Sequence, residues 1–91
     1  MRYVLFGKLN PNWVDKEERV SRSKRKLEEL DIKLEAVLYT QGSYDFVDVI
    51  STEDPTAALA FSAWYASQGF GELSSMPAYT TDQFSDALKR I

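Results

Sequence analysis

Residues 32–51 read IKLEAVLYTQGSYDFVDVIS and show the clearest strand pattern of the chain. Residues 32–40 alternate between two faces, one of them wetter, and residues 44–51 return with the same period of two. The tripeptide Gln41-Gly42-Ser43 between them suits a tight reversal. The stretch therefore predicts a β-hairpin whose first strand lies at the edge of a sheet.

A strand and a helix precede the hairpin. Residues 2–9 are largely apolar on both alternating faces, which indicates a central strand. Asp15 followed by Glu18 fits a helix N-terminus, and this helix should end near Leu30. Its narrow apolar stripe consists of Val20, Leu27 and Leu30, with Trp13 as an extension. The remaining helix surface is charged, so the helix should cover one side of a sheet.

A second helix and a further strand follow the hairpin. Asp54 and Pro55 are a helix start, since aspartate caps free amides and proline is shaped for the first helical position. We expect this helix over residues 56–68. Residues 71–79 form the weakest strand pattern, because Pro77 cannot donate to a ladder, so this strand should lie at an edge.

The last predicted element is a short helix. Thr80 and Gln83 match a capping box, which indicates a helix over residues 80–90. We expect Phe84, Leu88 and Ile91 to face inward.

Together these elements predict one α+β domain over residues 1–91. Strand, helix, hairpin, helix, strand is the order of a ferredoxin-like βαββαβ sandwich, here with a four-stranded antiparallel sheet and a short C-terminal helix. Both crossover helices then lie on one sheet face. The other face is left uncovered although it is largely apolar, and a second copy of the chain is the simplest cover.

Composition excludes several classes of chemistry. The 91 residues include no cysteine and no histidine, which removes thiolate zinc sites, histidine-ligated haem and the Ser-His-Asp and Cys-His arrangements. We expect no cofactor, and a metal would need oxygen ligands alone. The net charge of −3 argues against nucleic acid as a partner. Without a membrane span or signal-peptide pattern, we expect a cytoplasmic location.

The hairpin motif resembles that of a known family. Gly42-Ser43-Tyr44-Asp45, followed by Phe46-Val47, is similar to the Gly-x-Tyr-Asp signature of the GYD-domain family, and residues 3–8 resemble that family's opening strand. The resemblance runs from the first strand to the final helix. It implies similarity to the dimeric α/β barrel group, and therefore a homodimer or larger assembly. The family supplies no activity to carry over, and the missing histidine rules out a haem enzyme.

Lys8 and Asp48 are the charges least expected in their context, because each interrupts a mainly apolar strand. If buried together, they would form a polar point in a cavity. The alternative, which we favour, is a solvated salt bridge near a strand end.

Other candidate ligand-binding side chains are Tyr44 and Trp64. For the motif residues Gly42, Tyr44 and Asp45 we favour turn chemistry over a ligand loop. For Trp64, with Phe61 and Tyr65, we favour packing or a dimer contact over a ligand pocket. The basic cluster of Arg19, Arg22, Lys24, Arg25 and Lys26 is expected to be a solvated helix face, because flanking glutamates suit helix salt bridges.

Three hypotheses for function remain. The first is a homo-oligomeric binding or regulatory module whose paired sheet faces enclose a small ligand, an idea that the motif's likeness to leucine-responsive regulators supports by analogy. The second is a purely structural assembly domain. The third is a cofactor-independent oxygenase or isomerase, with Lys8, Asp48 and a tyrosine in acid-base roles. The third requires Lys8 and Asp48 to converge on one cavity.

Overall fold

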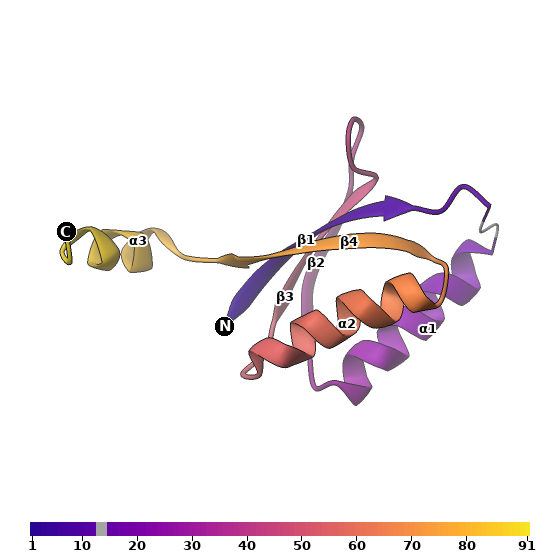
Figure 1. The fold of residues 1–91 in the computed structure, drawn as a ribbon, viewed down its shortest axis with the longest axis horizontal. Coiled ribbons are helices and arrows are strands. Elements are labelled where there is room, and N and C mark those ends of the chain that lie inside the picture. The colour runs from indigo at the N-terminus through magenta and orange to yellow at the C-terminus, as the bar shows by residue number, and fades with distance from the viewer. Residues whose placement is uncertain (13–14) are drawn as a thin grey trace.

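The computed structural model describes residues 1–12 and 15–91. Within these residues the elements follow the order expected from the sequence. They are β1 (Arg2–Leu9), α1 (Lys16–Glu29), β2 (Lys33–Tyr39), β3 (Phe46–Ser51), α2 (Pro55–Ser67), β4 (Gly71–Ala78) and α3 (Thr81–Leu88). The chain therefore has the ferredoxin-like α+β fold with an additional C-terminal helix (Figure 1).

The sheet is antiparallel with the strand order β2-β3-β1-β4. β1 is central, and β2 and β4 lie at the edges, as their patterns predict. Pro77 accordingly sits in an edge strand, where a missing N–H is tolerated.

A bulge in β2 changes which side chains share a face. The register shifts between Leu34 and Ala36, so that Leu34 lies opposite Ile50 while Val37 lies opposite Asp48. Leu34 and Val37 therefore face the same side of the sheet, because Asp48 and Ile50 are two residues apart in β3. The strict alternation expected for residues 32–40, which placed these two on opposite faces, is wrong beyond the bulge.

The helices begin at the caps that the sequence indicates. The Asp15 carboxylate accepts a hydrogen bond from the Glu18 amide at 2.9 Å, and Asp54 accepts one from the Thr56 amide at 2.9 Å. Both bonds satisfy amides that have no partner inside the helix. Trp13, the expected extension of the α1 stripe, lies outside the described residues.

α1 and α2 cover the same face of the sheet (Figure 1). Between them and the sheet lies the core, which includes Leu5, Ile50, Phe61 and Phe70. Gly7 of β1 lies opposite Phe46 of β3, and a Cβ added at Gly7 would stand 2.1 Å from the Phe46 ring. The glycine in this central strand thus makes room for an aromatic ring.

α3 differs from the expectation. Its capping box is present, with Thr80 and Gln83 each accepting a hydrogen bond from the other's backbone amide. However, Phe84 is 62% exposed, and Leu88 and Ile91 are exposed too, so the expected inward orientation is wrong. The reason is topological, because the chain leaves the end of β4 and carries α3 away from the sheet (Figure 1). Among residues 1–12 and 15–91, no other element packs closely against this helix.

The sheet face opposite the helices is open and largely apolar, as the sequence predicts. Register and alternation place on it the side chains of Val4, Phe6, Ala36, Leu38, Val47, Val49 and Met76. Leu38 is 62% exposed, and Met76 is exposed as well. Contiguous exposed apolar patches larger than a few hundred Å² are uncommon on monomeric proteins.

Candidate functional site

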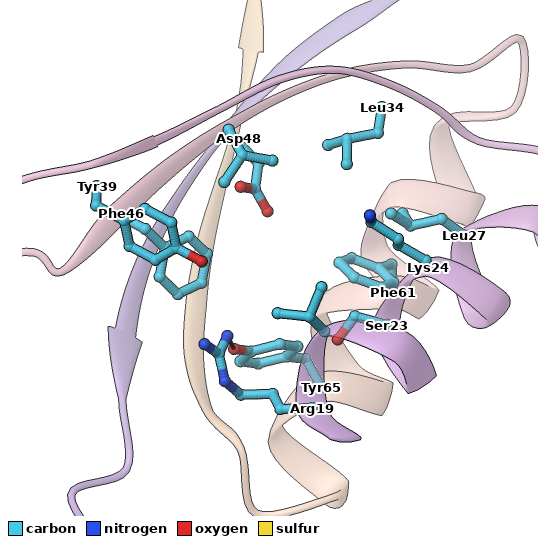
Figure 2. Close-up of a pocket in the computed structure, with 12 residues that line it drawn as sticks. Arg19, Ser23, Lys24, Leu27, Leu34, Tyr39, Phe46, Asp48, Phe61 and Tyr65 are labelled. Carbon is cyan, nitrogen blue, oxygen red and sulfur yellow. Dashed lines mark hydrogen bonds between the residues drawn. The ribbon is translucent and has the colours of Figure 1, made fainter. Parts of the chain in front are cut away.

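A pocket of about 70 Å³ lies on the helix side of the sheet, between α1 and the strands β2 and β3 (Figure 2). This is several times the ~10–15 Å³ that a single water needs. The walls combine apolar side chains with a few polar ones. The lining residues are Arg19, Val20, Ser23, Lys24, Leu27, Leu34, Val37, Tyr39, Phe46, Asp48, Phe61 and Tyr65.

The pocket follows from the residues that α1 turns toward the sheet. Arg19, Ser23 and Leu27 are four residues apart and therefore lie on one side of the helix. Arg19 and Leu27 are buried, and the short Ser23 side chain stands between them. Where a large apolar residue would fill the space against the sheet, serine leaves it open.

Asp48 supplies the negative charge of the pocket. It shares the helix-facing side of β3 with Phe46 and Ile50, and its neighbours across the sheet are Leu5 and Val37. Burial raises the pKa of its carboxyl group to about 6, and the positive charge of Arg19 acts in the opposite direction. The carboxylate points into the pocket (Figure 2). It is thus poised to accept hydrogen bonds from a bound molecule.

Arg19 supplies a positive charge on the facing wall. It is only 7% exposed, and its Nη1 donates a hydrogen bond to the Tyr65 hydroxyl at 3.1 Å (Figure 2). Burial raises the pKa of Tyr65, while the bond from Arg19 lowers it. The expectation that Arg19 belongs to a solvated basic face is therefore wrong. Its spacing from Ser23 and Leu27 was the signal in the sequence that could have placed it inward.

Two further polar side chains complete the lining. The Ser23 hydroxyl is buried and has no hydrogen-bond partner among the residues that the structure describes. Such a group is costly unless water or a ligand satisfies it. Lys24, the next residue on α1, is exposed and so keeps contact with solvent.

The structure separates Lys8 from Asp48. In the register of β1 with β3, Leu5 lies opposite Asp48, and Lys8 is an odd number of residues from Leu5. Their side chains therefore point to opposite faces of the sheet. Both readings that paired them, as a polar point in a cavity and as a solvated salt bridge, are wrong. The acid-base mechanism that required both in one cavity loses its basis.

Tyr44 accompanies Lys8 at one end of the open face. The Lys8 Nζ lies 5.9 Å from the centroid of the Tyr44 ring, which packs against Phe6 at 5.2 Å. Trp64 lies elsewhere again, stacked on Phe61 at 5.8 Å and meeting Phe70 edge-on at 5.7 Å. Among the four candidate ligand residues from the sequence, Asp48 alone lines the pocket.

The Gly-x-Tyr-Asp residues join the hairpin to β1. Gly42 has a φ of 124°, which favours glycine. The Asp45 carboxylate accepts a hydrogen bond from the Leu9 amide at 2.7 Å, and the Asp45 amide donates to the Gly7 carbonyl at 2.8 Å. These contacts hold the end of the hairpin against β1, which is a structural role for Asp45.

A family model described as the GYD domain matches residues 7–88, nearly the whole chain. The chain belongs to the GYD-domain family. The match includes the hairpin motif and every residue that lines the pocket. Comparison of this GYD domain with curated proteins finds no match.

Metal binding and membrane insertion can be assessed for the described residues. In residues 1–12 and 15–91, no three or more acidic side chains gather as a metal site. None of the helices in that part of the chain is long and apolar enough to span a bilayer.

Proposed function

We propose that this GYD domain is a self-associating module that binds a small molecule. Each copy holds its ligand in the pocket between α1 and the sheet, and the open sheet face joins one copy to another. The proposal rests mainly on the position of Asp48. Its half-buried carboxylate points into an apolar-walled pocket, opposite the buried Arg19.

The make-up of the pocket supports ligand binding. Small-molecule sites are concave and mostly apolar, with a few polar groups that fix orientation. Here Leu27, Leu34 and Val37 give apolar walls. Charges face the same space, as does the Ser23 hydroxyl, which has no hydrogen-bond partner among the described residues. Perturbed acids in clefts are enriched at functional sites, and the pKa of Asp48 is raised to about 6.

This proposal moves the ligand from where the sequence suggested. We expected the ligand between two paired sheet faces, on the side opposite the helices. The pocket described here lies on the helix side, within one copy. The two roles therefore use different faces, and each has its own test.

Ser23→Leu provides the test of the ligand site. Leucine at this position should fill the space between α1 and the sheet, so that the fold persists while the pocket closes. Ser21→Leu is the matched control, because Ser21 is exposed on the same helix and does not line the pocket. A library of small fragments is titrated into each variant, and NMR shifts of pocket amides are followed.

We expect fragments to shift the pocket amides of the wild type and Ser21→Leu, and not those of Ser23→Leu. If no fragment shifts a pocket amide of the wild type, or if Ser23→Leu responds as the wild type does, the ligand site is refuted.

A further inference from the structure

Two opposite charges face the same pocket without pairing with each other. Asp48 enters from β3 and Arg19 from α1 (Figure 2). The positive charge of Arg19 lowers the pKa of the Asp48 carboxyl group, yet no ion pair or hydrogen bond joins these two described residues. Each is thus free to engage a group of opposite charge that lies between them.

Both side chains retain hydrogen-bonding capacity toward the pocket. A guanidinium carries five N–H donors. Within the described residues, the Arg19 guanidinium donates a hydrogen bond to the Tyr65 hydroxyl. A carboxylate has two acceptor oxygens, and Asp48 accepts no hydrogen bond from any residue in the described ranges. The Arg19 side of the pocket therefore offers hydrogen-bond donors, and the Asp48 side offers hydrogen-bond acceptors.

We propose that the pocket binds a small zwitterion, with its cationic group at Asp48, its anionic group at Arg19 and a short aliphatic body against Leu27, Leu34 and Val37. This inference rests on the proposed function, because it names the class of ligand that the same pocket holds. The volume of about 70 Å³ limits the ligand to a compact molecule.

Charge balance favours a zwitterion over an ion of one sign. A simple amine would pair with Asp48 and leave its charge beside Arg19. A simple carboxylate would pair with Arg19 and stand against the desolvated Asp48. In each case a partly buried charge is left without a partner or meets a like charge, which is costly away from water. Lys24 is exposed and solvated, so it needs a ligand anion less than Arg19 does.

The test uses two isomeric zwitterions that share the same charge-deleted analogues. L-Norvaline carries its charges on one carbon, and δ-aminovaleric acid carries them at opposite ends of the same aliphatic chain. Removing the carboxylate from either gives butylamine, and removing the ammonium gives valerate. Each compound, together with neutral pentanol, is titrated into the protein at pH ~8, and affinity is measured from NMR shifts of the Arg19, Ser23 and Asp48 amides.

We expect one of the zwitterions to bind on the order of tenfold more tightly than both butylamine and valerate, because each analogue leaves one charge unmatched. Asp48→Asn should weaken that zwitterion on the order of tenfold and leave valerate unchanged or tighter. Ser21→Leu, which changes an exposed side chain outside the pocket, should bind the zwitterion as tightly as the wild type does.

The proposal is overturned if butylamine or valerate binds as tightly as both zwitterions, or if neither zwitterion binds. Binding of pentanol, butylamine or valerate in that case would leave the ligand site standing and refute only the ligand class. If none of the five compounds shifts the pocket amides, and the fragment library shifts none, the proposed function fails as well.

Discussion

Single residues explain why this sheet and α1 enclose a pocket. Ser23 leaves space where a core helix ordinarily presents a large apolar side chain, and Asp48 places a carboxylate in the middle of β3, opposite the apolar Leu5. Gly7, by contrast, gives up a side chain so that the Phe46 ring fits. The Phe46 ring thus fills the space above Gly7 and also lines the pocket, into which Asp48 brings a charge.

The pH dependence of the free energy of unfolding should show how much ionised Asp48 destabilises the fold. The pKa of its carboxyl group is about 6 in the folded chain, against an ordinary value of 3.8. Between these values the folded chain holds a proton that the unfolded chain has released. The free energy of unfolding therefore falls as pH rises through this interval and stays lower above it.

Asp48→Asn removes this ionisation and keeps the size of the side chain. At pH ~8 the variant should be more stable than the wild type by up to about 3 kcal/mol, since asparagine resembles the protonated acid and the pKa of Asp48 is raised from 3.8 to about 6. At pH ~4 the two should be nearly equal. Urea unfolding at both pH values measures the difference. A variant that is less stable than the wild type at pH ~8 would show that ionised Asp48 stabilises the fold.

At the scale of elements, local capping signals decide where each helix begins, whereas the chain connections decide where it packs. The caps at Asp15, Asp54 and Thr80 all form where the sequence indicates. α1 and α2 then pack on the sheet because short connections return them to it. α3 has an equally good cap and an apolar side, yet it extends away from the sheet (Figure 1).

Thr80→Ala tests whether α3 is held by its cap alone. Loss of the hydroxyl that accepts from the Gln83 amide should destabilise α3 by about 1 kcal/mol. Because the apolar side chains of α3 are exposed in the described part of the chain, amides of residues 83–88 should exchange several-fold faster with deuterium, while exchange in β1 stays the same. Thr80→Ser, which keeps an acceptor, is the control. Equal acceleration in β1 would mean that α3 is part of the cooperative core.

On the scale of the whole molecule, two apolar surfaces are left uncovered by the residues that the structure describes. The open sheet face and the apolar side of α3 both meet solvent. A 91-residue domain has a small core, so covering such surfaces by self-association would add stability. We therefore expect the proposed self-association to stabilise the fold, in addition to its role in function.

Leu38→Glu tests the open face as the site of self-association. A carboxylate on this apolar surface should shift the protein toward monomer, because a buried interface would leave the charge unpaired. Leu59→Glu is the matched control, since Leu59 is 68% exposed on α2 and away from the open face. Light scattering across a concentration series measures the molar mass. Wild type and Leu38→Glu with the same mass at every concentration would exclude this face as the interface.

The candidate site could be predicted from the sequence only in part. Asp48 stood out as a charge within an apolar strand, and that signal led to the pocket. Lys8 gave the same signal and belongs to the opposite face, because alternation along β1 and its register with β3 fix the direction of each side chain. Arg19 was harder to find, since it lies among neighbouring basic residues and is marked as inward-facing only by its spacing from Ser23 and Leu27.

The sequence by itself determined the order of elements, their caps, the central and edge strands and the family motif. These features depend on interactions between residues close together in the chain, or on the spacing of apolar residues. That spacing repeats every two residues in a strand and about every 3.6 residues in a helix, and it is visible within a single segment. The tertiary structure alone decided the β2 bulge that turns Val37 toward the helices, the meeting of Arg19 with Asp48 across the pocket, and the outward path of α3. Each of these depends on register and on distant packing partners, which local pattern does not encode.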